Sequence, residues 1–147
     1  MSIELIKIPV KKVYDDAIMP TRGSEHAAGY DLYAYIKDKD GNPSLKTVTG
    51  RHTTLFCTGL KMEIPEGYFG AIYARSGLAT KKLLRLGNAV GVIDSDYRGE
   101  IKVPLHNDRG QLQIIHDGDR IAQIIIQSYL PVEYEEVDEL SDTERES

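Results

Sequence analysis

Short apolar runs recur along the chain about every 8 to 15 residues, and turn-forming residues separate them. The runs that we predict to be strands are residues 3–13, 28–36, 51–64, 68–74, 112–116 and 121–129. Residues 39–43 and 65–67 combine Gly with Pro or Asp, which is the chemistry of tight turns. Residues 78–86 form the one segment predicted to be helical, and it is short and basic. The pattern predicts an all-β sandwich or barrel with one short helix.

The chain has 147 residues, of which 41% are hydrophobic and 28% are charged, so one globular domain with its own core is expected. We predict a β domain over residues 1–132 and an acidic tail over residues 133–147. Such tails are most often mobile. In this one, Val132, Tyr134 and Val137 could instead pack as a strand on a neighbour.

Charge and composition exclude several classes of function. The net charge of −5 argues against nucleic acid as a partner, because polyphosphate backbones are bound by basic surfaces. The sequence contains no membrane-spanning run and no signal peptide, so we expect a cytoplasmic protein, or also a nuclear one if the source is eukaryotic. Cys57 lies in an apolar segment and is assigned no chemistry, and four scattered histidines make no zinc site. Any metal would be held mainly by oxygen atoms, which suits magnesium carried by phosphates.

Residues 87–107 are the stretch that most suggests chemistry, because a small β-branched run ends there in an acidic turn before apolar alternation resumes. They predict a β-hairpin with Asp94 and Asp96 on one face of its mouth and Tyr97 on the other. A plain turn is the simpler alternative, since these residue types are the commonest turn formers. A calcium loop is excluded because an arginine and a leucine occupy positions that need oxygen ligands.

Residues 91–99, Gly-Val-Ile-Asp-Ser-Asp-Tyr-Arg-Gly, resemble the third motif of the trimeric dUTP diphosphatases (dUTPases). Residues 27–34, 74–79 and 118–124 resemble the first, second and fourth motifs of that family, in order. The resemblance implies a jelly-roll β-sandwich or distorted barrel, the dUTPase-like β-clip, assembled as a homotrimer with sites shared between subunits. It also implies hydrolysis of dUTP to dUMP and pyrophosphate, which limits uracil in DNA and supplies dUMP for thymidylate synthesis.

The resemblance further implies a role for each matching residue. Asp94 would activate the water that attacks the α-phosphate, and Asp31 would hold the cofactor Mg²⁺ through water. The substrate-binding residues would be Arg75, Ser76, Gly77, Asn88, Gly91, Val92, Ile93, Tyr97, Lys102, Gln123 and Arg145. Backbone groups near Asn88 and Val92 would pair with uracil, and Tyr97 against the sugar would reject a 2′-hydroxyl.

Each motif also has a purely structural interpretation when it is taken alone. Asp31 could be satisfied by backbone amides at a strand end, and Gln123 could be a core amide. Ser76 and Gly77 could simply cap the short helix, whose free amides and dipole otherwise suit an anion. Arg120 could pair with a carboxylate across a subunit contact or touch the ligand.

The resemblance departs from the family at the fifth motif, a glycine-rich tail that begins with Arg and closes over the nucleotide. Only Arg145 matches it, so the residues present do not supply this lid or the water exclusion that a lid provides. The departure leaves open a second function, in which dUTP binding gates contact with a protein partner. A dCTP deaminase shares the fold, but its cytosine-deaminating residues are not evident here.

Overall fold

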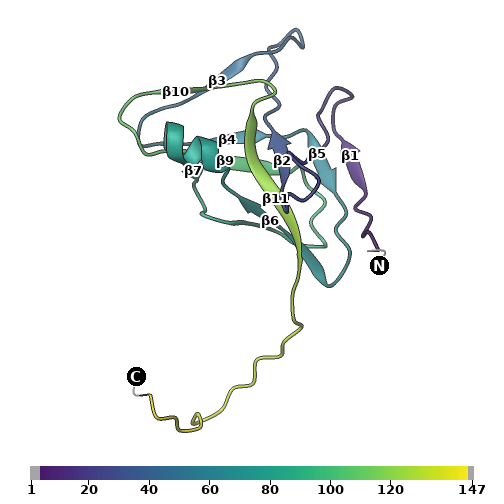
Figure 1. Cartoon of the computed structure of the whole chain (residues 1–147), viewed down its shortest axis with the longest axis vertical. Coiled ribbons are helices and arrows are strands. Elements are labelled where there is room, and N and C mark those ends of the chain that lie inside the picture. The colour runs from purple at the N-terminus through teal and green to yellow at the C-terminus, as the bar shows by residue number, and fades with distance from the viewer. Residues whose placement is uncertain (1–3, 146–147) are drawn as a thin grey trace.

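The computed structural model describes residues 4–145 as an almost entirely β structure (Figure 1). Its strands are β1 (Val10–Lys12), β2 (Tyr30–Tyr33), β3 (Leu45–Val48), β4 (Thr53–Cys57), β5 (Leu60–Met62), β6 (Tyr68–Tyr73), β7 (Leu84–Leu86), β8 (Gly91–Ile93), β9 (Lys102–Asn107), β10 (Gln113–His116) and β11 (Arg120–Ser128). The single helical element among these residues is the short π-helix η1 (Leu78–Lys82). The predicted all-β fold with one short helix is therefore confirmed. Nowhere in residues 4–145 is a helix long and apolar enough to cross a membrane.

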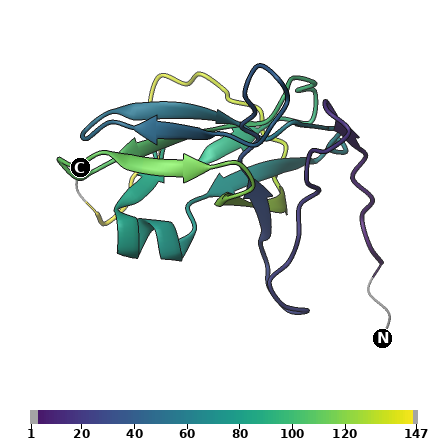
Figure 2. The same cartoon turned by 90° about the horizontal axis from the view of Figure 1, so that it is seen from above.

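The strands pair antiparallel throughout and form four sheets. The two larger sheets have the orders β2-β11-β6-β8 and β4-β9-β7, and the two smaller ones are β1-β5 and β10-β3. Figure 2 shows the strands layered around a common interior, with the helical turn η1 at the periphery. None of these sheets of residues 4–145 closes on itself, so the fold is a jelly-roll or β-clip rather than a closed barrel.

The core is built from the inward-facing residues of several strands. In β9, Val103, Leu105 and Asn107 are buried while the residues between them are more exposed, which is the period-two pattern of a strand with one face in the core. The buried Asn107 is fully hydrogen-bonded: its Nδ2 donates to Val48 O at 2.9 Å and to Gln111 O at 2.8 Å, and its Oδ1 accepts from Arg109 N at 2.9 Å. This one amide therefore joins β9 to β3 and to the loop that follows β9.

The predicted helix 78–86 is wrong in its second half. The helical turn ends at Lys82 because Leu83 takes a left-handed conformation, with φ of 53°. Leu84 and Leu86 then point into the core from β7, which pairs with β9. Alternating burial, rather than a helical period, decides the structure of this segment.

Two predicted strands are also corrected, and β3 was not predicted. Within residues 3–13 only β1 forms; Pro9, which has no N–H to donate, precedes it, and residue 3 lies outside the described residues. Residues 51–64 divide into β4 and β5 at Gly59, whose φ of 72° breaks the extended backbone. Three of the four residues of β3 are exposed, so its apolar signal is weak. The other predicted strands match within three residues at each end.

The predicted hairpin over residues 87–107 is wrong as a paired unit. β8 pairs with β6, whereas β9 pairs with β4 and β7, so residues 94–101 cross from one large sheet to the other. Ile101 N donates to Leu60 O at 2.8 Å, which joins the start of β9 to β5 of the small β1-β5 sheet. The acidic turn is therefore a crossover between sheets.

Beyond β11 the chain runs away from the body as an extended arm (Figure 1). No residue from 129 to 145 belongs to a helix or strand. The apolar side chains of Leu130, Tyr134 and Leu140 are 84%, 95% and 86% exposed. Within the part of the chain that the structure describes, these side chains have no packing surface.

Candidate active site

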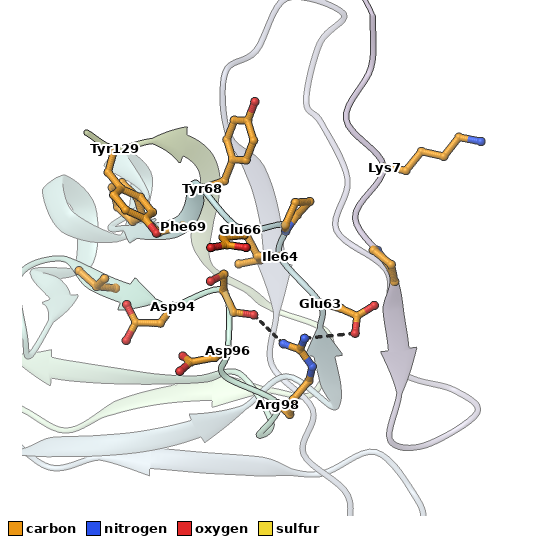
Figure 3. Close-up of a pocket in the computed structure, with 14 residues that line it drawn as sticks. Lys7, Glu63, Ile64, Glu66, Tyr68, Phe69, Asp94, Asp96, Arg98 and Tyr129 are labelled. Atoms are coloured by element: carbon orange, nitrogen blue, oxygen red, sulfur yellow. Dashed lines mark hydrogen bonds and ion pairs between the residues drawn. The ribbon is translucent and has the colours of Figure 1, made fainter. Parts of the chain in front are cut away.

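The crossover after β8 carries the two acidic residues of the third motif. Asp94 follows directly on Ile93, and Tyr97 N donates to Asp94 O at 3.1 Å to close a tight turn. Figure 3 shows the side chains of Asp94 and Asp96 pointing to the same side of this turn. Both residues are exposed, and neither makes an ion pair with another described residue. An unpaired, accessible carboxylate is suited to act as a general base.

An open groove of about 1160 Å³ lies beside this turn (Figure 3). Besides Asp94 and Asp96, its lining includes Glu63 and Glu66 from the connection between β5 and β6, and the aromatic pair Phe69 and Tyr129. The rings of that pair have centroids 6.4 Å apart. No sequence pattern pointed to these four lining residues, because they come from separate segments of the chain.

The Tyr97 side chain is held in a folded-back position. Its hydroxyl donates to Glu100 O at 2.9 Å, and its ring lies directly against Gly99. A Cβ at Gly99 would come within 2.7 Å of the Tyr97 ring carbon that bears the hydroxyl, so only glycine permits this position. Tyr97 as a residue remains 42% exposed, so it is accessible to a ligand.

The turn between β7 and β8 presents the next group of predicted binding residues. Val90 N donates to Asn88 O at 2.7 Å, and Ala89 has a left-handed φ of 64°, which makes the turn very tight. β8 follows at the edge of its sheet, so one side of its backbone makes no ladder bonds within the described chain. Val92 is 60% exposed on this edge strand. Lys102 lies across the crossover, as the first residue of β9.

A second cluster forms where β2, β11 and the end of β6 meet. Arg75 Nε donates to Asp31 Oδ1 at 2.9 Å, and Arg120 Nη1 lies 3.8 Å from Asp31 Oδ2. The Asp31 side chain is 15% exposed, so its buried charge is balanced by two arginines of the same chain. Asp31 is therefore paired with arginine side chains rather than with backbone amides alone. The carboxylate that Arg120 approaches is Asp31 of the same chain.

Gln123 is packed into the same cluster. Its Nε2 donates to Ala74 O at 3.0 Å, next to Arg75. Its side chain lies over Gly29, where a Cβ would come within 3.0 Å of Gln123 Cδ and 3.2 Å of Gln123 Cβ. The glycine of the first motif thus makes room for the glutamine of the fourth.

Ser76 and Gly77 follow Arg75 at the start of η1. The residue that caps η1 is Gly77, and the cap has no side-chain hydrogen bond, so the Ser76 hydroxyl does not act as a helix cap. Backbone hydrogen bonds instead begin with Ala79 N, which donates to Arg75 O at 3.0 Å. The Ser76 hydroxyl and nearby amides are left to receive a ligand.

The two clusters lie far apart in one chain. In the antiparallel pairing of β6 and β8, Gly70 faces Ile93, so Asp94 lies near the beginning of β6. Arg75 lies just past the other end of β6. The intervening six residues of strand span roughly 20 Å, so Asp94 and Arg75 of one chain lie at opposite ends of β6.

Two further observations bear on chemistry. No group of three or more His, Cys, Asp or Glu side chains in residues 4–145 is arranged to hold a metal ion. Burial raises the pKa of the Cys57 thiol, which is the opposite of what a nucleophile needs and agrees with its lack of assigned chemistry.

The most perturbed group lies outside both clusters. The Tyr35 hydroxyl donates to Asp16 at 2.8 Å, and burial together with this bond raises the pKa of Tyr35 to about 12. Lys37 Nζ donates to Asp117 at 2.7 Å, and this bond raises the pKa of Lys37. We interpret these contacts as a structural tie between loops.

Comparison with known proteins gives one consistent family. The dUTPase family model matches residues 15–147. The deoxyuridine 5′-triphosphate nucleotidohydrolase of Hydrogenobaculum sp. is 42% identical over 141 residues, covering 96% of this chain and 93% of that protein. The protein of the same name from Arabidopsis thaliana is 41% identical over 136 residues, covering 92% and 76%.

Solved structures agree on the fold. A variant dUTPase of Staphylococcus bacteriophage 80alpha with dUpNHpp superposes with a TM-score of 0.80 at 24% identity, covering 94% of this chain and 92% of that one. A variant dUTPase from phage phi11 of S. aureus, described for its coordination of a structural Mg(II) ion, gives 0.75 at 22% identity and covers 91% and 98%.

Proposed function

This chain belongs to the dUTPase family, and from that premise we propose that it hydrolyses dUTP to dUMP and pyrophosphate. The observation that carries the proposal is the composition of the two clusters. One offers an unpaired carboxylate, Asp94, beside an open strand edge, and the other offers Arg75 and Gln123 beside uncapped amides. A base and a polyanion cradle are the two parts that anhydride hydrolysis requires.

The Arg75 cluster would bind the triphosphate. Phosphoric anhydrides resist hydrolysis because their negative charge repels a nucleophile, so a catalyst must neutralise the phosphate oxygens. The contact from Arg75 Nε to Asp31 orients the guanidinium and leaves its Nη donors for phosphate. The Ser76 hydroxyl, the Gly77 amide and Gln123 would add neutral donors to the charge that develops.

The donor set fits Mg²⁺ held through water. Asp31 Oδ2 is only loosely engaged, 3.8 Å from Arg120 Nη1, so it keeps a lone pair for a metal-bound water. Mg²⁺ keeps several of its waters and is commonly held by substrate phosphates with one or two carboxylates, so a full protein cage is not required. When bound, the metal would neutralise phosphate charge.

Asp94 would supply the proton transfer. Its carboxylate would orient a water molecule in line with the α-phosphorus and accept its proton as the new P–O bond forms. The bond to the bridging oxygen then breaks, and pyrophosphate leaves. We assign Asp96 to the shape of the turn rather than to proton transfer, because one base suffices.

The edge of β8 and the tight turn before it would select uracil. Free backbone groups near Asn88, Gly91, Val92 and Ile93 can pair with the N–H and the carbonyls of uracil, and Lys102 lies close in sequence to the same crossover. Cytosine would leave buried polar groups unpaired, at a cost of about 1–3 kcal/mol for each. The methyl group of thymine would clash with the backbone of this edge strand. Tyr97, packed against the sugar, would exclude the 2′-hydroxyl of UTP.

We propose that each site is shared between copies in a homotrimer. The roughly 20 Å between Asp94 and Arg75 supports this, because one chain alone leaves each cluster incomplete. The exposed apolar residues of the arm, such as Leu130 and Tyr134, also lack a packing surface among residues 4–145. Arg145, at the far end of that arm, would then reach a site on another copy.

In the cell we propose a cytoplasmic enzyme that limits uracil in DNA and supplies dUMP for thymidylate synthesis. The test is pyrophosphate release from dUTP beside dCTP, dTTP and UTP, with Mg²⁺ and with a chelator. Asp94→Asn is compared with Asp40→Asn, which alters an exposed turn away from both clusters. Selective, metal-dependent release that collapses only in Asp94→Asn is expected. Tight dUTP binding without release would refute hydrolysis and favour a protein that gates a partner.

A further inference from the structure

The turn that carries Asp94 is held at its two ends, by β8 before it and by Gly59 N, which donates to Glu100 Oε2 at 3.2 Å, and between these ends it makes one further contact with the rest of the fold. Most hydrogen bonds of residues 94–99 stay within the crossover, such as Tyr97 N to Asp94 O and Tyr97 hydroxyl to Glu100 O. Among the hydrogen bonds and ion pairs of residues 4–145, the contact between Arg98 and Glu63 is the only one that joins this segment to another part of the chain. Arg98 therefore makes the one contact that holds residues 94–99 between these fixed ends.

The Arg98 guanidinium forms a three-way bridge (Figure 3). Its Nη1 donates to Ser95 O at 2.6 Å and lies 3.3 Å from Tyr97 O, and its Nη2 donates to Glu63 Oε1 at 3.1 Å. Glu63 is fixed in turn, because its backbone N donates to Pro9 O at 2.9 Å beside β1. One planar cation thus links the turn carbonyls to the β1-β5 sheet.

We propose that Arg98 is a positioning residue that holds Asp94 in register for proton transfer, with Glu63 as its anchor. The inference rests on the proposed hydrolysis only for the role of Asp94. A carboxylate on an exposed turn reacts well only if its orientation is fixed beforehand. A lysine at this position could not reach the same acceptors at once, because it lacks the planar fork of arginine.

The alternative is a surface ion pair without function. The Arg98 and Glu63 side chains are 54% and 60% exposed, and exposed pairs contribute little to stability. The chain offers a matched control in Arg85, which pairs with Asp108 at 2.9 Å, also donates to a backbone carbonyl, and is 49% exposed. Neither Arg85 nor Asp108 belongs to the two clusters.

The kinetic test compares Arg98→Ala, Arg98→Lys, Glu63→Gln and Arg85→Ala. Arg98→Ala is expected to lower kcat about tenfold while KM changes less than about threefold, because the phosphate cluster is untouched. Arg98→Lys and Glu63→Gln should fall in between, and Arg85→Ala should match the unmodified protein. Millimolar methylguanidinium should restore much of kcat to Arg98→Ala, whereas sodium chloride of equal ionic strength should not. Equal kcat for Arg98→Ala and Arg85→Ala would overturn the proposal.

A second measurement does not depend on turnover. Hydrogen–deuterium exchange of a peptide covering residues 94–99 should quicken in Arg98→Ala and stay unchanged in Arg85→Ala, with similar melting temperatures. Unchanged exchange in Arg98→Ala would show that no tether exists and would refute the inference. Absence of dUTP hydrolysis by the unmodified protein would instead refute the proposed function, and the exchange result would still decide the tether.

Discussion

Mixed assemblies give the sharpest test of a shared site. Asp94→Asn removes the base from one cluster and Arg75→Ala removes the main cation from the other, and each change alone should lower kcat at least about a hundredfold. Because the two residues lie roughly 20 Å apart along β6, a working site would take Asp94 from one chain and Arg75 from the next. Mixed assemblies of the two variants should therefore contain some sites with both residues intact and regain activity.

The expected recovery follows from counting contacts. In a ring built from one repeating heterologous contact, random mixing of equal amounts gives an intact Asp94 facing an intact Arg75 at about one quarter of contacts. Co-refolding Asp94→Asn with Arg75→Ala should thus restore about one quarter of the unmodified kcat per site, from nearly none in either alone. The assay is pyrophosphate release from dUTP after mixing, refolding and size-exclusion chromatography.

The matched control mixes unmodified chains with the double variant that carries both lesions. Shared sites predict about one quarter of full activity in this mixture, whereas sites complete within one chain predict about one half. No recovery in the first mixture together with one half in the second would refute the reasoning. It would mean that each chain folds its own clusters together and that the separation along β6 is bridged by a rearrangement.

Three further outcomes follow from contacts described above. Gly29→Ala should push the Gln123 amide out of its cluster and lower kcat/KM about tenfold with little loss of stability. Gly23→Ala places its Cβ where no atom lies within 4 Å, so it should change neither kcat/KM nor stability. Equal kinetics for the two variants would refute the steric argument. Asn107→Ala removes the hydrogen-bond partner of the buried Val48 carbonyl and of two partly buried groups, Gln111 O and Arg109 N, and should lower the free energy of unfolding in urea by about 3 kcal/mol, so an unchanged midpoint would contradict the assigned network. The folded pKa of Tyr35 is about 12 against 10.0 for a free side chain, so its contribution is complete below pH 10 and is lost as the pH rises toward 12; denaturation curves of Tyr35→Phe should decline less over this window, though not become flat, because the raised pKa of Lys37 acts in the same direction.

The parts of the site that could be predicted from the sequence are the groups of residues that lie next to one another in the chain. Asp94 and Tyr97, or Arg75 and Ser76, are neighbours in sequence, so a motif places them together whatever the fold does around them. The pairing of Asp31 with Arg75 is different, because 44 residues separate them and the register of β2 and β6 on β11 decides whether they meet. Sequence reasoning from the residues alone had no access to that register.

The wrong predictions for residues 78–86 and 87–107 share one physical cause. Apolar alternation tells which face of a strand is buried, but it does not tell which strand lies next to it. The hairpin prediction assumed that two adjacent runs pair with each other, whereas β8 and β9 each found partners elsewhere. The predicted helix over residues 78–86 includes Leu84 and Leu86, but their burial in β7 beside β9 overrides any helical preference.

The separation of the two clusters along β6 has a genetic consequence. If each site joins one cluster from each of two neighbouring chains, then a defective chain assembled with normal ones also inactivates sites to which a normal chain contributes. A chain damaged in a single cluster silences the site on one of its sides, and a chain damaged in both silences the sites on both. Alleles of this protein would therefore be graded in dominance by whether they alter one end of β6 or both, even where every chain folds equally well.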